Sequence, residues 1–274
     1  FLFKLGTFYI WLFFAQTWNF FMIKIITTCY NCESYISSCI KSIQMQEEKN
    51  WEMYIMDDAS TDSSVSVARE FAKKDSRIII TQNKENKGAV FNKTVNFVSV
   101  AKPDNEDIIV TVDGDDYLKH SKTLSYLNTI YSKGYWLTYG GFSSSPLIQF
   151  PEDHLSPVDW SKSLRNQRFC LTHLRSHKFF LLKNVKDVDL KYKDGRFFKY
   201  GEDMVLFVPM AEMAEKNRCF HIKDKLYYYR FHDKNDHHLN NEERDIIKHD
   251  LSFRVPYKKT TKKQLINSKC NWTL

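Results

Sequence analysis

The chain has 274 residues, of which 43% are hydrophobic and 27% are charged, and its formal net charge is +7. This length accommodates one large α/β domain or two small ones around a substantial core. The basic residues form no patch interleaved with aromatic side chains, which argues against a nucleic-acid-binding protein.

The first 21 residues, Phe1 to Phe21, form an apolar and aromatic N-terminal extension. Its length would nearly span a bilayer, so a membrane anchor is one interpretation. Met22 directly precedes the first expected strand. We favour the alternative that Met22 is the natural start and that the extension is upstream translated sequence.

Strands and helices alternate from Met22 to the middle of the chain. Enrichment in β-branched residues predicts a strand over 22–28 and a fourth that begins at Asp107, and strands are also predicted over 51–56 and 77–81. Apolar residues at helical spacing predict helices from about Glu33, after Thr61 or Asp62, from 88 to 100 and over 123–131. This alternation is typical of βαβ units and predicts an α/β fold, a mainly parallel central sheet between two layers of helices.

The six cysteines include one C-x-x-C pair, Cys29 and Cys32, and no second pair at zinc-binding spacing. Reduced thiols in a cytosolic compartment are the simpler expectation. The protein is therefore expected in the cytoplasm, and membrane association through the N-terminal extension or the basic C-terminal end stays open.

The second half of the chain shows no clear alternation. Residues 143–257 are expected to mix helices and loops and to continue the same domain. Residues 258–274 form a basic tail, because from Arg254 onward there are five lysines and no acidic residue. We expect a solvated, partly disordered end, with attraction to anionic lipid as the alternative.

Polar clusters follow three of the predicted strands: Tyr30-Asn31, Asp57-Asp58 and Asp113 to Asp116. Ligands bind beyond the carboxyl ends of strands in parallel α/β sheets, so these clusters should line one edge. Crowded carboxylates need a neutralising cation, and Asp113 and Asp115 could hold a divalent metal if Gly114 permits a sharp turn. An acidic turn that merely ends a strand is the alternative.

The sequence lacks the Gly-rich loops of two nucleotide-binding classes. No G-x-x-x-x-G-K-[ST] is present and no G-x-G-x-x-G follows the first strand, which disfavours P-loop NTPases and dinucleotide oxidoreductases. A carboxylate-bound metal at a sheet edge suits a nucleoside diphosphate instead. Asp58 could accept a hydrogen bond from a base, with Thr28 and Tyr30 around it, although helix capping is an alternative for the Asp57-Asp58 cluster.

Five motifs in order make the chain resemble the family 2 glycosyltransferases, which have the GT-A fold. They are Thr28 to Glu33, Asp57 to Asp62, Asn86-Lys87-Gly88, Asp113 to Asp116 and Gly201-Glu202-Asp203. Three further segments resemble a bacterial and viral branch: Thr172 to Arg175, Pro209 to Ala214 and Leu226 to Arg230. The resemblance covers residues 22–257 and implies a nucleotide-sugar-binding half, 22–142, and an acceptor half, 143–257.

The resemblance implies an inverting, metal-dependent transfer from a nucleotide-diphosphate sugar, expected to be a UDP-sugar, to a hydroxyl of a glycan or lipid-linked acceptor. Asp203 matches the general base, and Thr28, Tyr30 and Asp58 match the nucleotide pocket. Asp113 and Asp115 match the D-x-D pair that places Mn²⁺ or Mg²⁺ on the diphosphate. The other expected substrate contacts are Lys93, Asp116, His173 and Glu202.

The match to this family is incomplete in places. Lys93-Thr94 stands where many relatives have Arg-Asn, which leaves a phosphate contact by Lys93 open, and Asn92 could lie on a solvated helix face. His232, His237 and His238 could contact metal or phosphate or belong to a surface loop.

Two other functions stay open: a nucleotidyltransferase, and a non-catalytic sugar-nucleotide-binding protein of the same fold. Glu202-Asp203 could also simply start a helix, and both roles are compatible.

Overall fold

The computed structural model describes residues 21–145, 156–233, 235 and 241–272. Residues 1–20, His237, His238 and part of the irregular stretch after Ser143 lie outside the described residues. Within the described part of the chain, no helix combines the length and the hydrophobicity that a membrane span requires.

One eight-stranded sheet organises the molecule, in the order β3-β2-β1-β4-β7-β6-β8-β5. Its strands are β1 (Ile23–Cys29), β2 (Trp51–Asp57), β3 (Ile78–Gln82), β4 (Ile108–Thr111), β5 (Tyr117–Leu118), β6 (Leu137–Ser143), β7 (Arg175–Lys178) and β8 (Cys219–Tyr228). Strands β1 to β4 are mutually parallel, as predicted, whereas β7 pairs antiparallel with both β4 and β6. The α/β fold is confirmed, with a mixed sheet.

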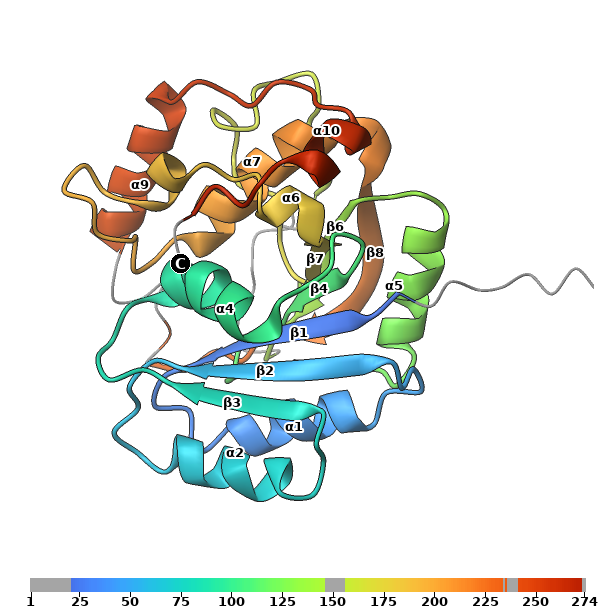
Figure 1. The fold of residues 1–274 in the computed structure, drawn as a ribbon, viewed down its shortest axis with the longest axis vertical. Helices are drawn as coiled ribbons and strands as arrows, with labels where there is room; N and C mark the ends of the chain where they lie inside the picture. The colour runs from blue at the N-terminus through green and yellow to red at the C-terminus, as the bar shows by residue number, and fades with distance from the viewer. Residues whose placement is uncertain (1–20, 146–155, 234, 236–240, 273–274) are drawn as a thin grey trace, which may run out of the picture.

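Helices cover both faces of the sheet (Figure 1). Helices α1 (Ile36–Gln44) and α2 (Ser64–Ala72) lie on one face of β1 to β3, and α5 (Thr123–Ser132) flanks the sheet. The opposite face carries α3 (Ala89–Phe91), the π-helical η1 (Asn92–Asn96), α4 (Phe97–Ala101), α6 (Phe179–Leu182), α7 (Glu202–Ala214) and α10 (Lys262–Asn267). The remaining helices are η3 (Asp187–Leu190), η4 (Lys216–Arg218) and α9 (Asn241–Phe253).

Alternation along the strands divides the buried residues into two cores. Met53 and Ile55 of β2 point to the core beside α1 and α2, whereas Tyr54 and Met56 point to the core beside α4 and α7. Successive side chains of a strand face opposite sides of a sheet, so a strand covered on both faces is apolar throughout. The near-continuous apolar runs of β1, β2 and β4 follow from this burial.

Residues 143–257 contribute the two strands β7 and β8, where the sequence predicts a mixture of helices and loops. The four residues of β7 are Arg175, Ser176, His177 and Lys178, and all of them are buried. Two of these residues bond internally: Ser176 Oγ bonds to Tyr131 and Thr138, and the Lys178 ammonium donates to the Glu106 carbonyl. A hydrophobic pattern cannot reveal such a strand.

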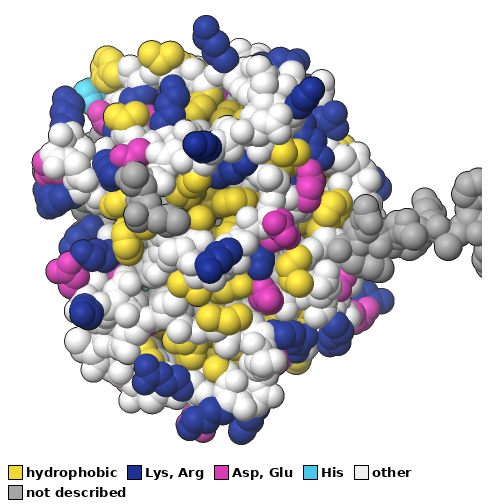
Figure 2. Space-filling view, in the orientation of Figure 1, with side chains coloured by type: hydrophobic (Ala, Val, Ile, Leu, Met, Phe, Trp, Pro, Cys, Tyr) yellow, Lys and Arg dark blue, Asp and Glu magenta, His cyan; other side chains and the backbone are white. Residues whose placement is uncertain are grey.

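The prediction of a disordered basic tail is wrong. Thr261 caps α10 through a capping box with Gln264, and Leu265 and Trp272 are buried. The indole of Trp272 donates to the Val185 carbonyl at 2.8 Å, and Lys183 Nζ donates to the carbonyls of Ile266 and Ser268. The lysines of the segment remain at the surface, and Figure 2 shows Lys and Arg distributed over this side of the molecule.

Candidate active site

A cleft of about 1050 Å³ opens at the carboxyl ends of β1, β2 and β4. The predicted site residues Thr28, Tyr30, Asp58, Asp113, Asp115, Asp116, His173, Glu202 and Asp203 all line it. Lys93 does not line this cleft in the structure. Topology therefore brings together residues that are up to 175 positions apart, from Thr28 to Asp203.

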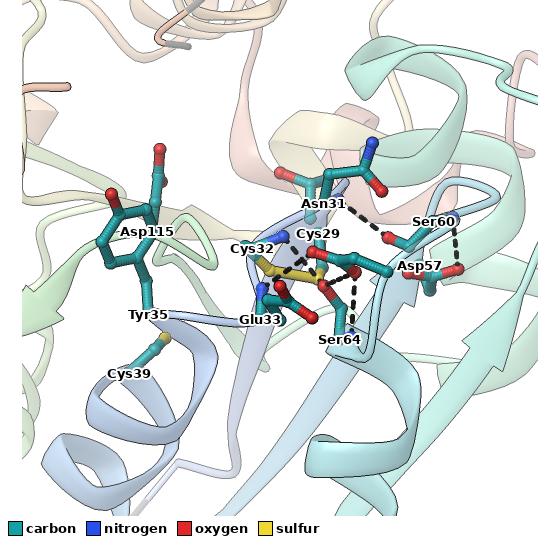
Figure 3. Close-up of a disulfide and its surroundings, with 12 residues drawn as sticks. Cys29, Asn31, Cys32, Glu33, Tyr35, Cys39, Asp57, Ser60, Ser64 and Asp115 are labelled. Carbon is teal, nitrogen blue, oxygen red and sulfur yellow. Dashed lines mark hydrogen bonds between the residues drawn. A yellow bond between two sulfur atoms is a disulfide. The ribbon is translucent and has the colours of Figure 1, made fainter. Parts of the chain in front are cut away.

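The turns after β1 and β2 are tied together along one wall of the cleft (Figure 3). Asn31 has a positive φ of 51°, a conformation that Asn tolerates better than most residues. Its amide donates to Ser60 Oγ and its side-chain oxygen accepts from the Thr61 amide, both at 2.9 Å. Glu33 bonds reciprocally to the 62–64 turn, through Asp62 and the Ser63 amide. These bonds hold the loop that presents Tyr30, which is 53% exposed, to the cleft.

Cys29 and Cys32 form a disulfide, contrary to the prediction of reduced thiols (Figure 3). Cys29 ends β1 and Cys32 lies in the turn before α1, which places their Cα atoms 6.1 Å apart, within disulfide range. The turn between them folds the two side chains together, a tertiary effect that the spacing of the cysteines does not reveal.

Asp58 organises the loop that carries Asn86-Lys87-Gly88. Its Oδ1 accepts from Asn83 Nδ2 and the Lys87 amide, and its Oδ2 accepts from the Gly88 amide, each at 2.8 Å. A carboxylate has about four acceptor positions, so these three bonds leave it capacity for one more donor. Gly88 has a φ of 85°, and a Cβ there would lie 2.6 Å from Lys199 Cα, which explains the glycine.

The acidic turn Asp113 to Asp116 packs against the end of β1 and the turn after it. A Cβ on Gly114 would lie 2.9 Å from the Thr28 carbonyl oxygen and 3.1 Å from Cys32 Sγ. The glycine is therefore required by this close approach, where the sequence suggests only a sharp turn. Asp116 is buried, accepts from the Tyr227 hydroxyl and the Arg230 amide at 2.7 Å, and so ties the turn to the end of β8. Burial, reinforced by Asp115 and Asp113, raises its pKa well above the usual value.

Asp115 meets a second loop at the mouth of the cleft. Its Oδ2 lies 3.0 Å from His232 Nε2 and 3.4 Å from Asn235 Nδ2, and the His232 ring stacks on Tyr35 with centroids 4.8 Å apart. The guanidinium of Arg230 donates to the Asp115 carbonyl at 2.8 Å. These contacts close the loop after β8 over the acidic turn.

The donor set fits a divalent cation that shares its coordination with a phosphate group. Asp115 offers a carboxylate at the cleft, which is a ligand type suited to Mg²⁺ and Mn²⁺. Within the described ranges, no three His, Cys, Asp or Glu side chains converge as a complete metal-binding group. The protein would therefore supply one or two ligands, and phosphate oxygens would complete the shell, as is usual for Mg²⁺.

Lys93 lies beneath the cleft, not at its surface, and is 2% exposed. Its ammonium forms two ion pairs of 2.9 Å, with Asp113 Oδ1 and Glu202 Oε1. Burial disfavours the charged form of each of the three groups, but the attraction between Lys93 and the two carboxylates outweighs it. The pKa of Lys93 is raised, and those of Asp113 and Glu202 are lowered. Lys93 thus bridges the acidic turn after β4 and the first turn of α7, and its phosphate contact stays a prediction. Neighbouring Asn92 is likewise buried, not on a solvated face, and bonds to Asn83 and Asn96.

Glu202 and Asp203 form the first turn of α7, so the helix-start interpretation is confirmed. Asp203 Oδ1 accepts from the Met204 amide at 2.9 Å, and Asp203 Oδ2 lies 3.6 Å from Arg175 Nη1. Arg175, at the start of β7, is buried, and its other terminal nitrogen lies 3.9 Å from Glu202 Oε1. Burial would lower the pKa of Arg175, but Asp203 and Glu202 raise it.

His173 stacks on Tyr227 with ring centroids 4.5 Å apart and approaches Arg175 Nη2 to 3.4 Å. Burial, together with Arg175 and Lys93, lowers the pKa of His173 well below its usual value. A neutral imidazole at this place can donate or accept a hydrogen bond without adding charge.

Three residues at the site have no assigned role in the sequence analysis: Tyr227, Arg230 and Asn235. Tyr227 and Arg230 stand in a segment that resembles other family members, but only the fold shows that they hold Asp115 and Asp116. Of the three candidate histidines, His232 lines the cleft, whereas His237 and His238 lie outside the described residues.

Several known proteins are similar to this chain. Curated relatives include the glycosyltransferase GlyG of Streptococcus pneumoniae serotype 4, 28% identical over 76% of this chain and 70% of its own length. The glucosyltransferase WfaP of Escherichia coli is 32% identical over 47% of this chain and 54% of its own length. The chain spans only 27% and 33% of the lengths of EpsH and EpsE from Bacillus subtilis.

Among solved structures, S. aureus TarS 1-349 in complex with UDP-GlcNAc has a TM-score of 0.64 and 20% identity over 89% of this chain and 70% of that one. The Pyrobaculum calidifontis mannosyltransferase PcManGT, solved with GDP-Man and Mn²⁺, has a TM-score of 0.57 and 18% identity over 80% of this chain and 59% of that one. These likenesses support the GT-A fold. The model of the family described as Glycosyl transferase family 2 matches residues 24–188. The chain belongs to glycosyl transferase family 2.

Proposed function

We propose that the chain transfers a sugar from a UDP-sugar to a hydroxyl group with inversion at the anomeric carbon. The observation that carries this proposal is the cleft itself, which places the Asp58 and Tyr30 walls, the acidic turn and the Asp203 carboxylate around one space. The walls would hold the uracil and ribose, and Asp115 would face the diphosphate. Two similar proteins, WfaP and TarS, carry UDP-sugars in their descriptions.

Asp203 would act as the general base. Inversion requires an acceptor hydroxyl that loses its proton as it attacks from the face opposite the leaving diphosphate, and Asp203 stands on α7, a different element from the acidic turn. Its Oδ1 is fixed by the Met204 amide, and its Oδ2 faces Arg175 beyond hydrogen-bond distance. The carboxylate is therefore oriented, and the nearby Arg175 balances its charge.

Asp115, with Asp113 beside it, would hold Mn²⁺ or Mg²⁺ on the diphosphate. Such a cation, when bound, stabilises the charge that develops on the leaving group. Lys93 already neutralises Asp113, so we assign Asp115 the larger share of the metal contact. Lys93 would also hold the acidic turn and the start of α7 in fixed positions. One of its ion pairs reaches Asp113 and the other reaches Glu202, next to the proposed base.

A lipid-linked saccharide is the acceptor class that we favour, because WfaP is described as acting on a GlcNAc-diphosphoundecaprenol. The test incubates the full chain with Mn²⁺, UDP-glucose or UDP-GlcNAc and a short-chain lipid-diphosphate GlcNAc. We expect UDP release coupled to a glycosylated lipid with inverted anomeric configuration. UDP release without a glycosylated product would reject this acceptor class, and a product with retained configuration would reject Asp203 as a general base.

Arg175 is expected to set the acidic limb of the pH profile. Its positive charge favours the ionised form of Asp203, so removing it should make deprotonation of the base harder and move the limb to higher pH. We predict that Arg175→Gln moves that limb of the kcat/KM profile to higher pH. Arg175→Lys, which retains the charge, should keep the limb close to its original position.

The matched control is Arg165→Gln. Arg165 is another buried arginine, paired with Glu212 through two contacts of 2.8 Å and located away from the cleft. Its loss should lower stability and leave the pH limb unmoved. If the Arg175→Gln limb also stays in place, Arg175 does not act on the base.

A further inference from the structure

Two aromatic side chains meet in the cleft beside the ends of β6 and β8. Phe142, near the end of β6, and Tyr229, directly after β8, both line the cleft, and their ring centroids lie 5.5 Å apart. The backbone holds them together, because the Tyr229 amide donates to the Ser143 carbonyl at 2.8 Å. Phe142 is 8% exposed, whereas Tyr229 is only partly buried. We call Phe142 and Tyr229 the aromatic pair.

The run Tyr227-Tyr228-Tyr229 sends its three rings to different surroundings, because successive side chains of an extended segment point to opposite faces. Tyr227 is buried, and its hydroxyl donates to Asp116. Tyr228 stacks on Tyr117 with ring centroids 4.7 Å apart. Of these three tyrosines, all within the described residues, only Tyr229 lines the cleft. Its neighbour Tyr228 is therefore a matched control.

The aromatic pair and the Asp58 and Tyr30 walls lie on opposite sides of the acidic turn. In the sheet, β2 and β1, which lead into these walls, come before β4, whereas β7, β6 and β8 come after it. The acidic turn follows β4 and therefore separates the two groups. A nucleotide held by the walls, with its diphosphate at Asp115, would leave the space beside the aromatic pair for a saccharide.

His173 stands between the aromatic pair and the proposed base. Its ring centroid lies 5.9 Å from that of Phe142 and 5.8 Å from that of Tyr229. Its Nε2 lies 3.4 Å from Arg175 Nη2, and Arg175 Nη1 lies 3.6 Å from Asp203 Oδ2. A saccharide with a hydroxyl at Asp203 would therefore lie in the part of the cleft that the aromatic pair borders.

We propose that Tyr229, backed by Phe142, forms a stacking subsite for the pyranose ring of the acceptor. One face of a pyranose presents C–H groups, and these pack on the electron-rich face of an aromatic ring. The hydroxyls at the edge of the sugar stay free to reach polar groups, Asp203 among them. This inference rests on the proposed function for the role of Asp203, and saccharide binding itself is measured without turnover.

The test is saturation-transfer difference NMR on the full chain with Mg²⁺ and UDP, with the methyl glycosides of glucose and N-acetylglucosamine as probes. We expect saturation of the ring protons on one face of a bound probe. Tyr229→Ala should weaken probe binding by about five- to tenfold, the contribution of one aromatic contact, whereas Tyr229→Phe keeps the ring and should bind like the original chain. Tyr228→Ala removes the neighbouring ring and should leave probe binding unchanged.

Calorimetric titration with UDP, UDP-glucose and UDP-GlcNAc separates the acceptor from the donor sugar. The affinities for all three should be the same in Tyr229→Ala and in the original chain. Loss of affinity for a UDP-sugar, with that for UDP unchanged, would place the donor sugar on Tyr229 and overturn the proposal. Undiminished probe binding by Tyr229→Ala, or no saturation with the original chain, would also overturn it. Absence of UDP binding would instead reject the proposed function, and the probes, tested without nucleotide, would still decide the subsite.

Discussion

Replacing Asp203 by Asn is expected to reduce kcat by about 10²- to 10⁴-fold, the usual contribution of a general base. Asn preserves the shape of the side chain and can still accept from the Met204 amide through its oxygen, but it cannot take a proton from the acceptor hydroxyl. The ion pair between Asp203 and Arg175 is lost as well. Its 3.6 Å separation makes it a weaker contact than a hydrogen bond. Affinity for UDP should change little.

Steady-state transfer and calorimetric UDP binding, measured on the same protein, test this prediction. Asp194→Asn makes the same chemical change at an exposed carboxylate paired with Arg196, and should leave both quantities unchanged. Equal losses of UDP affinity and turnover in Asp203→Asn would mean that the residue shapes the cleft and does not act in the reaction.

Replacing Asp115 by Asn is expected to abolish metal-dependent turnover and to weaken Mn²⁺ binding by about a hundredfold or more. Substitution of a residue that only supports a metal ligand typically lowers metal affinity about 10- to 100-fold. Loss of the charged ligand itself should therefore lower it by about 100-fold or more. Asn retains an oxygen, but it lacks the negative charge that a divalent cation requires. The contacts with His232 and Asn235 can largely persist, so the loop after β8 should stay in place.

The amplitude of the electron paramagnetic resonance signal of free Mn²⁺, recorded with UDP present, reports metal binding without reference to activity. Asp224→Asn, a change at an exposed residue of β8, is the matched control. If Asp115→Asn binds Mn²⁺ as tightly as the original chain, other residues hold the metal and Asp115 is not a ligand.

The sequence predicts the first half of the fold well, because its signals there are local. Each strand from β1 to β4 carries a largely apolar run, and helices with an apolar stripe follow, so most of residues 22–131 can be assigned without tertiary information. The two-residue strand β5 is the exception. The position of the site follows from topology, since parallel strands place Tyr30, Asp58 and Asp113 at one edge.

Other features depend on contacts that no local pattern encodes. Strand β7 consists of polar residues whose burial is offset by partners on α5, on β6 and before β4. The order of the C-terminal segment comes from the fit of Trp272 and Leu265 against α6 and its flanks. The Lys93 bridge joins residues 109 positions apart, Lys93 and Glu202, and a lysine on a predicted helix carries no sign of it.

The measurement that tests the central claim most directly is calorimetric titration of the full chain with UDP, GDP and CDP, each with and without Mn²⁺. We expect UDP to bind at least about tenfold more tightly than the other two, and only in the presence of Mn²⁺, because the diphosphate completes the coordination that Asp115 begins. Absence of binding by every nucleotide to folded protein would contradict the donor site, and the roles assigned to Asp58, Asp115 and Asp203 would fall with it.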